Sequence, residues 1–323
     1  MRPLPAGKLV VVITGLYDAI CLRHGDRPEV LDVLTEMDVA EAGAAVTTPH
    51  DVELILNRPA DLDRDSRAMV QGSRIAGFAT LDLLLDRQQV RAALGFRPGH
   101  VDRVAAPLLG WVEDRARELT DAQRWSTPVT VTWQLPGAIA DPTLRARRWS
   151  VVRRFSHLRA ELDRLPEPPS TPAGVSIDVA ADAGAAECVH QVLEEALAQH
   201  WEHRPVPTQR FLTGERAAAG FDPSLWFVAR LNGRPAAAVI GRRSGIQGWI
   251  GWLGTRPAHR GRGLARLLLS TAMTALARAG STQIALDVDT GNDTGALRLY
   301  ESMGFAVHYQ ADQWRHTTSP TAR

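Results

Sequence analysis

The sequence has almost no lysine and little cysteine. Lys8 is the only lysine among 323 residues, so the chain lacks the Gly-Lys-Ser/Thr pattern of a Walker-type nucleotide site. The two cysteines, Cys21 and Cys188, argue against a disulfide framework and are typical of a reducing compartment, so we expect a cytoplasmic protein. A formal net charge of +1 gives no overall attraction for nucleic acid, which we do not expect as a partner.

Long hydrophobic runs are also missing. The apolar stretch at residues 8–14 is too short to cross a membrane, and the sequence after it does not resemble the end of a signal peptide. We therefore predict that this stretch is a buried first strand, and we expect no membrane partner.

Prolines gather near the middle of the chain. Residues 165–174 contain four of them, which hold the backbone extended and prevent a regular helix or a central strand. The length of the chain suits two domains, each large enough to bury a core. We predict a first domain at 1–165, a linker at 166–174, a second domain at 175–314 and a tail at 315–323.

Residues 255–269 place a glycine-rich turn between a strand-like run and an amphipathic helix. Gly261 and Gly263 allow a tight turn, and the N–H groups at the helix start attract anions, so the segment is typical of a phosphate or pyrophosphate site. The third glycine of the dinucleotide fingerprint is absent, and an arginine-rich surface turn is the alternative for this segment taken alone. Positive charge is available from Arg260, Arg262 and Arg266.

A second motif follows downstream. Residues 284–289 alternate apolar and polar side chains, which predicts a strand. Residues 292–294, Asn-Asp-Thr, can cap a short helix that carries Tyr300. Gly304 is placed to end that helix, and Phe305 begins a further extended segment.

These two motifs, in this order and spacing, resemble those of the GNAT N-acetyltransferase superfamily over residues of about 175 to 312. Residues 260–265 match its acyl-CoA pyrophosphate loop, and residues 292–305 match its second cofactor-side motif. The resemblance implies an α/β (α+β) fold with a mixed, mostly antiparallel twisted sheet flanked by helices. It also implies acetyl-CoA as co-substrate and no metal ion.

The first half of the chain echoes the second. Residues 97–100 match residues 256–259, and residues 148–151 parallel residues 304–307. We therefore predict two tandem GNAT folds, an arrangement similar to that of the mycothiol synthase group. Val104 stands opposite Gly263 and Leu144 stands opposite Tyr300, so we expect the first copy to be degenerate and unable to bind CoA.

The resemblance also implies the residues that would hold acetyl-CoA. Gly251 and Gly254 suit a bulged strand ahead of the loop. The Leu253 N–H would donate to the thioester carbonyl oxygen, and the Thr255 main chain would pair with pantetheine. The full set is Leu253, Gly254, Thr255, Arg260, Gly261, Arg262, Gly263, Leu264, Ala265, Asn292 and Tyr300.

The same resemblance assigns Tyr300 the role of proton donor to the departing thiolate, with simple packing against pantetheine as the alternative. Asn292 would bind pantetheine, although its spacing to Tyr300 is one residue longer than is common, and a helix cap is the competing role.

The general base is not identified. Many superfamily members carry a glutamate where this chain has Gly251. Glu202 and His203 are candidates, and the strand aspartates Asp287 and Asp289, or a water molecule, are others. The His200-x-x-His203 spacing lacks a third ligand for zinc.

From these features we predict an acetyl-CoA-dependent N-acetyltransferase that acts on the amine of a small molecule by direct attack in a ternary complex. A non-catalytic acyl-CoA-binding or regulatory module and a protein N-acetyltransferase are the alternatives. We expect a monomer or a homodimer.

Overall fold

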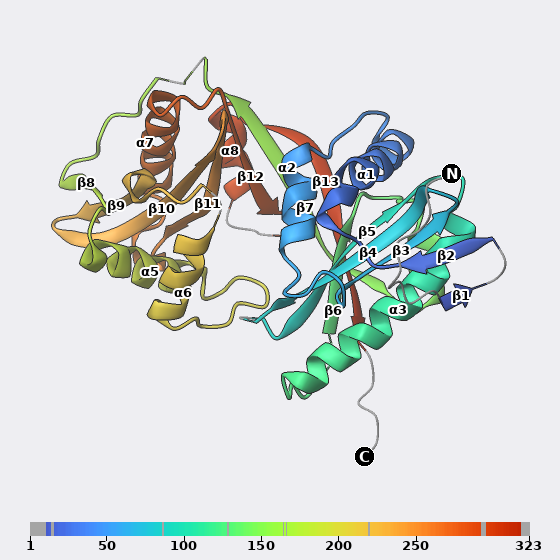
Figure 1. The fold of residues 1–323 in the computed structure, drawn as a ribbon. Helices are drawn as coiled ribbons and strands as arrows, with labels where there is room; N and C mark the ends of the chain where they lie inside the picture. Colours follow the sequence, from blue (N-terminus) through green and yellow to red (C-terminus); the bar gives the residue numbers. More distant parts are fainter. Residues whose placement is uncertain are drawn as a thin grey trace. The chain divides into compact units, whose positions relative to one another are not determined.

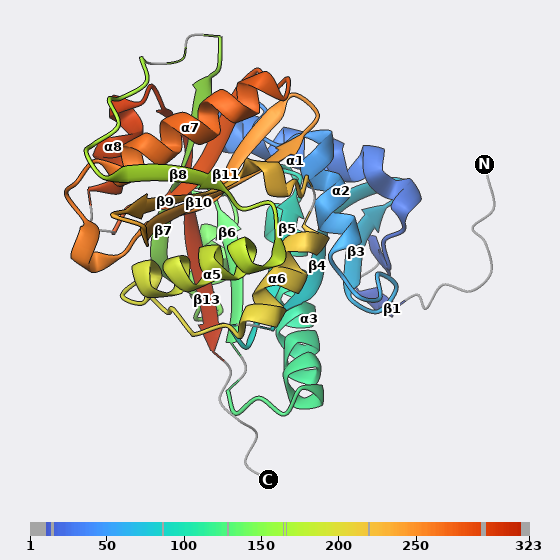
Figure 2. The same cartoon turned by 90° about the vertical axis from the view of Figure 1, so that its left-hand side faces the viewer.

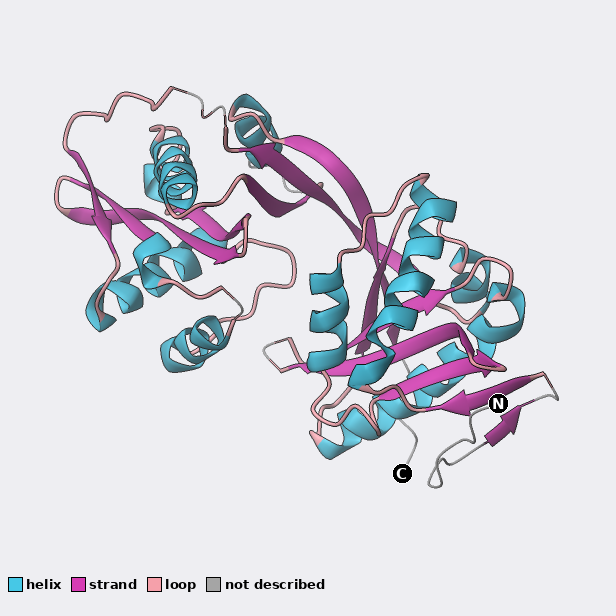
Figure 3. Cartoon of the chain, turned by 45° about the horizontal axis from the view of Figure 1, so that its top comes forward, coloured by secondary structure: helices cyan, strands magenta, loops and turns pink. Residues whose placement is uncertain are grey.

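The computed structural model describes residues 11–13, 16–85, 87–127, 129–163, 165, 167–218, 220–291 and 295–317. The chain forms two compact units, each a layer of strands flanked by helices (Figure 3). The first unit runs to Arg154 and includes the segment from Gln310 onward, and the second comprises residues 155–309. Among the described residues, no helix is long and apolar enough to cross a membrane.

The first unit has the strand order β1-β2-β3-β4-β5-β6-β13 (Figure 1). Neighbouring strands are antiparallel except β5 and β6, which are parallel. Its elements are β1 (Val11–Ile13), β2 (Tyr17–Ile20), η1 (His24–Asp26), α1 (Arg27–Ala42), α2 (Pro49–Asn57), β3 (Ser66–Gln71), β4 (Arg74–Leu84), β5 (Gln89–Phe96), α3 (Val101–Ala122), β6 (Val129–Gln134) and α4 (Asp141–Ala146). The predicted first strand is thus present at β1, and residues 8–10 and 14 lie outside the described residues.

The second unit has the order β7-β12-β11-β10-β9-β8, antiparallel except for β11 and β12. Its elements are residues 155–161 of β7 (Ser150–Glu161), β8 (Val175–Val179), α5 (Ala183–Leu197), α6 (Thr208–Ala217), η2 (Pro223–Leu225), β9 (Trp226–Leu231), β10 (Arg234–Ser244), β11 (Gln247–Thr255), η3 (Pro257–His259), α7 (Leu264–Arg278), β12 (Gln283–Asp289), α8 (Ala296–Ser302) and residues 306–309 of β13 (Ala306–Thr317). Figures 1 and 2 show α5 and α6 on one face of β9–β11 and α7 on the other.

Two strands, β7 and β13, each pair with a strand from the other half of the sequence. β7 ends the first half, yet its residues 155–161 pair with β12. β13 ends the second half, yet its residues 312–317 pair with β6. The compact units are therefore interleaved along the sequence, whereas the predicted limits 1–165 and 175–314 divide it at one linker and remain a prediction.

The tandem folds predicted from the internal echo are confirmed by matching backbone contacts. The Arg97 N–H donates to the Ala76 carbonyl, and the Arg256 N–H donates to the Ala236 carbonyl, both at 2.9 Å. The Arg97 guanidinium also donates to Ile75 O at 2.6 Å, and that of Arg256 donates to Pro235 O at 2.8 Å. In the first copy Arg97 follows β5 and links its end to the start of β4. In the second copy Arg256 follows β11 and links its end to the start of β10 in the same way.

A second match follows the short helix of each copy. The Trp149 N–H donates to Leu144 O at 2.9 Å, and the Phe305 N–H donates to Tyr300 O at 3.1 Å. The residues before these aromatics, Arg148 and Gly304, both adopt left-handed backbone conformations, with φ of 65° and 89°. The two halves therefore share the local geometry that places Leu144 opposite Tyr300.

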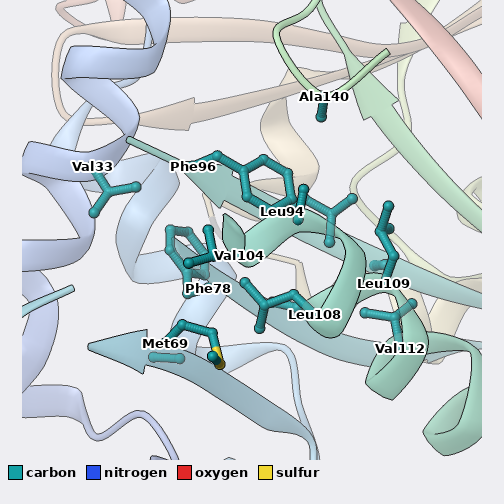
Figure 4. Packing of buried hydrophobic residues seen from close by; sticks show 14 of the residues in the cluster. Val33, Met69, Phe78, Leu94, Phe96, Val104, Leu108, Leu109, Val112 and Ala140 are labelled. Atoms are coloured by element: carbon teal, nitrogen blue, oxygen red, sulfur yellow. The ribbon is translucent and has the colours of Figure 1, made fainter. Parts of the chain in front are cut away.

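In the described part of the chain, three clusters of buried side chains form the cores. The first unit has one cluster, in which side chains of α3 such as Leu108 and Leu109 pack with Phe78 and Phe96 of the strands (Figure 4). The second unit has one cluster beneath α7 and α8 and another beneath α5 and α6. Leu158 of β7 belongs to the cluster beneath α7 and α8, so the first half of the sequence contributes to the core of the second unit.

The position of Leu158 predicts the cost of truncating it. Leu158 is 0 % exposed, so Leu158→Ala should lower the free energy of unfolding by about 2–5 kcal/mol. Val151 lies on the same strand and is 37 % exposed, so Val151→Ala should cost less than about 1 kcal/mol. Urea denaturation of the two variants measures both values. Equal losses would contradict the packing of β7 into this core.

Candidate functional site

β11 and β12 pair over only three residues and then separate. Their ladder runs from Gln247 and Gln283 to Trp249 and Ala285. Beyond that point β11 continues to Thr255 beside β10, and β12 continues to Asp289 beside β7. Beyond the ladder, the backbone N–H and C=O groups on the facing edges of β11 and β12 are not paired with each other. They can pair instead with an extended ligand that carries amides.

β11 carries a bulge at the expected glycine. Trp252 pairs with Ile240 and Ile250 pairs with Gly241, so Gly251 is an extra residue between them. A Cβ at Gly251 would lie 3.3 Å from Cζ of Arg242. The guanidinium of Arg242 therefore occupies the space beside the bulge.

Arg242 is held there by a buried carboxylate that sequence reasoning missed. Glu215 of α6 accepts a hydrogen bond from Arg242 Nη2 at 2.5 Å and another from Trp252 Nε1 at 3.0 Å. These three side chains lie on the face covered by α5 and α6, because Trp252 pairs with Ile240, which packs in that cluster. No spacing in the sequence links Glu215 to the bulge.

The residues expected to contact pantetheine follow the bulge. Leu253 packs against the cluster beneath α7 and α8. Gly254 faces α5, where an added Cβ would lie only 2.7 Å from the Ala196 Cβ, so close packing of the helix requires glycine there. Thr255 Oγ1 is buried and has no hydrogen-bond partner among the described residues. An orphaned hydroxyl at the end of the diverging strand fits a polar ligand such as the pantetheine arm.

The predicted loop has left-handed glycines at both expected positions. Gly261 and Gly263 have φ of 74° and 77°, and nothing lies within 4 Å of a Cβ built on either. Glycine is thus required by the backbone conformation. α7 begins at Leu264, and its first bond is the Leu267 N–H to Gly263 O at 3.0 Å. The N–H groups before Leu267, including that of Ala265, therefore lie at the open, electropositive end of the helix.

The three arginines of this segment differ in their contacts. Arg260 donates to Ala196 O at 2.9 Å and to Thr255 O at 3.3 Å, so it braces the loop against α5 and β11. Arg266 donates to the hydroxyl of Ser302 and so joins α7 to α8. Arg262 is exposed and makes no hydrogen bond or ion pair with the described part of the chain. It is the arginine of the three whose charge remains available to an anion.

Tyr300 lies in the core beneath α7 and α8. Its ring meets the ring of Phe305 edge-on at 5.9 Å, and burial raises the pKa of Tyr300 to about 12. The phenol therefore stays protonated throughout the physiological pH range. Asn292, predicted to bind pantetheine, lies outside the described residues.

The candidate bases from the segment before α6 form a separate polar cluster. His203 Nε2 lies 3.3 Å from Glu194 of α5, and Glu194 also lies 3.5 Å from His190. Glu202, beside His203 in the chain, adopts a left-handed conformation with φ of 55°. These contacts tie the segment to α5, and the role of Glu202 and His203 as bases remains a prediction. No group of three or more His, Cys, Asp or Glu side chains suited to a metal ion occurs among the described residues.

The two strand aspartates differ. Asp289 accepts a hydrogen bond from the Gly291 N–H at 2.9 Å, within the turn after β12. Asp287 lies 2.9 Å from Nδ1 of His157, a residue of β7 that sequence reasoning missed. His157 and Asp287 are 130 positions apart, so no local motif could have brought them together.

The first unit lacks the open loop. α3 begins at Val101, and the Val104 N–H donates to His100 O at 3.1 Å. The residues aligned with the glycine turn are thus the first turn of a helix. Val104 is fully buried beside Phe78 (Figure 4). The backbone that could bind an anion in the second unit is helical and packed in the first.

Diverging parallel strands, a bulge and a glycine turn at a helix start together define an acyltransferase fold of the acetyl-CoA-using type. Residues 187–305 match the model of the acetyltransferase (GNAT) family, and this match and the fold together support an acyltransferase with tandem GNAT folds.

Similar proteins match most of the chain. It is 28% identical over 302 residues to the mycothiol acetyltransferase of Catenulispora acidiphila, covering 86% of this chain and 93% of that protein. A GCN5-related N-acetyltransferase of Sphaerobacter thermophilus has a similar fold, with a TM-score of 0.83, 21% identity and coverage of 96% and 98%. A tandem GNAT protein from the clavulanic acid biosynthesis pathway has a TM-score of 0.64 at 17% identity, with coverage of 95% and 100%.

The contacts of the arginines predict which of them contributes to CoA affinity. Arg262→Ala should weaken CoA binding about 5- to 30-fold, since it removes an available cation at the helix N-terminus. Arg278→Ala is the matched control, because Arg278 is exposed at the other end of α7. Isothermal titration calorimetry compares the two. Equal affinities would contradict an anion site at the start of α7.

Proposed function

We propose that this chain transfers the acetyl group of acetyl-CoA to the amine of a small molecule, by direct attack in a ternary complex. The observation that carries the proposal is the separation of β11 from β12 directly beside the glycine turn of α7. The separated strands suit an extended pantetheine arm, and the glycine turn suits a diphosphate. The two features lie at the two ends of the short segment from Trp249, where the ladder ends, to Leu264, where α7 begins.

Several residues would hold the co-substrate. The N–H groups from Gly261 to Ala265 would bind the diphosphate, with Arg262 adding charge. Thr255 and the edge of β11 would pair with pantetheine. Asn292, which the resemblance also assigns to pantetheine, lies outside the described residues. The Leu253 N–H would donate to the thioester carbonyl oxygen as negative charge develops on it.

The chemistry requires one bond to form and one to break. The amine nitrogen attacks the thioester carbonyl carbon, a C–N bond forms, and the C–S bond breaks with its electron pair on sulfur. Burial keeps Tyr300 protonated. The phenol would therefore be available to donate its proton to the departing thiolate.

The acceptor would bind on the face covered by α5 and α6. Trp249, Trp252 and Arg242 lie on that face of β10 and β11, next to the bulge. Buried Glu215 fixes Trp252 and Arg242 in place. The surface thus offers flat aromatic area beside an ion-paired guanidinium, a combination suited to a polar small molecule.

Amine-dependent release of free thiol tests this function. Purified protein is incubated with acetyl-CoA and a panel of amino sugars, amino acids and simple amines, and the thiol is measured against a reaction without amine. Release with some small amines and not with peptides would support the proposal. Tight CoA binding with no release would favour a binding module instead, and release with peptide N-termini alone would favour a protein acetyltransferase.

Tyr300→Phe tests the role of the phenol. Phenylalanine keeps the packing against Phe305 and removes only the hydroxyl, so turnover should fall about 10- to 1000-fold while affinity for acetyl-CoA changes little. Tyr17→Phe removes a hydroxyl from the first unit and should leave turnover unchanged. Undiminished turnover in Tyr300→Phe would show that the hydroxyl takes no part.

A further inference from the structure

A histidine of β7 lies at the point where β11 and β12 separate. The ladder between these strands ends at Trp249 and Ala285, and Asp287 is two residues further along β12. His157 is the residue of β7 paired with Asp287, and its Nδ1 lies 2.9 Å from Asp287 Oδ1. The imidazole therefore lies beside β12 at the start of the opening.

The His157 ring extends across β12 toward β11. Its centroid lies 5.6 Å from the Trp249 ring on β11. On its other side it stacks on Tyr309 of β13, at 4.6 Å and an interplanar angle of 10°. Contacts on three different strands hold the ring in one orientation over the mouth of the opening.

The His157–Asp287 pair lies on the face proposed for the acceptor. Along β12, Asp287 alternates with Leu286 and Val288, which pack beneath α7 and α8. Trp249 pairs with Arg242, so both belong to the opposite face, as His157 does. An amine entering over this face would meet the imidazole before it reached the thioester.

Glu215 and His203 are less suited to act as the base than His157. Glu215 accepts two hydrogen bonds, one of them from an arginine, and an ion-paired carboxylate is a weak base. His203 forms a similar pair with Glu194 of α5, but among the described residues it contacts neither Trp249 nor Asp287 at the end of the ladder. The bulge residue itself is Gly251, which has no side chain to act as a base.

We propose that His157 is the general base of the reaction and that Asp287 is its positioning residue. The inference rests on the proposed function. Asp287 fixes the tautomer in which Nδ1 carries a proton, which leaves the Nε2 lone pair available. As the amine forms its C–N bond and the C–S bond breaks, the amine proton passes to Nε2. The imidazolium then returns that proton to solvent, which can reach the dyad since the Asp287 side chain is 53% exposed.

The titratable and charged groups around His157 come from three strands. Asp287 is on β12, Arg159 is on β7, and His308 and Tyr309 are on β13. Burial lowers the pKa of His308, and the charges of Arg159 and His157 lower it further, so His308 favours the neutral form. Asp287 is thus the anionic partner of His157 in this group.

This assignment gives the first half of the chain a part in the chemistry. β7 belongs to that half in sequence, and its residues 155–161 complete the sheet of the second unit. The second half alone would contain the loop, Tyr300 and Asp287, and it would lack the base.

His157→Gln tests the proposal in the full-length protein, with acetyl-CoA and the best amine of the panel. It should lower kcat about 10²- to 10⁴-fold. The limb of the pH profile of kcat/KM that reports the imidazole should disappear, while the limb of the amine itself remains. Added imidazole should partly restore turnover in His157→Ala. His308→Gln removes a neighbouring imidazole and should stay within about threefold of the wild type.

Asp287→Asn separates positioning from direct participation. Loss of the carboxylate should lower kcat about tenfold with little change in KM, because the imidazole is then no longer held in the tautomer with Nε2 free. Asp287→Asn also tests the proposal if His157→Gln fails to fold, because Asp287 is exposed and its replacement is conservative. An undiminished kcat in Asp287→Asn would then overturn the proposal.

Calorimetry with acetyl-CoA distinguishes a wrong base assignment from a wrong proposed function. If His157→Gln binds acetyl-CoA and turns over with an unchanged pH profile, the base assignment is wrong while the proposed function stands. If the wild type neither binds acetyl-CoA nor releases thiol, the proposed function itself is wrong.

Discussion

The opening in the second unit depends on the ladder between β7 and β12. After Ala285, β12 has lost β11 as a neighbour, and among the described strands β7 alone still pairs with it there, through to the pair of Asp289 with Phe155. Without β7, this part of β12 would have unpaired backbone on both edges, and closure against β11 would satisfy it. The strand from the first half of the sequence thus keeps the two diverging strands apart, and it presents His157 at the same place.

The contrast between the two copies rests on two glycines. Gly261 and Gly263 adopt conformations that a side chain resists, and they delay the start of α7 until Leu264. In the first copy the aligned residues accept helical conformations, so α3 starts at Val101 and takes up the same N–H groups in its own hydrogen bonds. A difference of one helical turn therefore separates a potential anion site from an ordinary buried helix start.

Much of this arrangement could be predicted from short stretches of sequence. The turn at Gly261 and Gly263, the bulge at Gly251 and the repeat of the tandem folds are local patterns, and each is present in the structure. Three features could not be predicted. The contact of Glu215 with Arg242, the pair of His157 with Asp287 and the pairing of β13 with β6 join distant residues. Strand order and side-chain partners across a sheet depend on the whole fold, and no spacing within one segment encodes them.

The pairing of β6 with β13 also constrains the order of events during synthesis. β6 ends at Gln134, yet the strand that covers it begins to pair at Asp312, near the end of the sequence. While a ribosome is still producing the second half, β6 has an uncovered edge that neighbouring nascent chains can join. Completion of the first sheet is therefore a late event, and the time spent translating the intervening segment is the period in which this protein is most exposed to aggregation and most in need of chaperones.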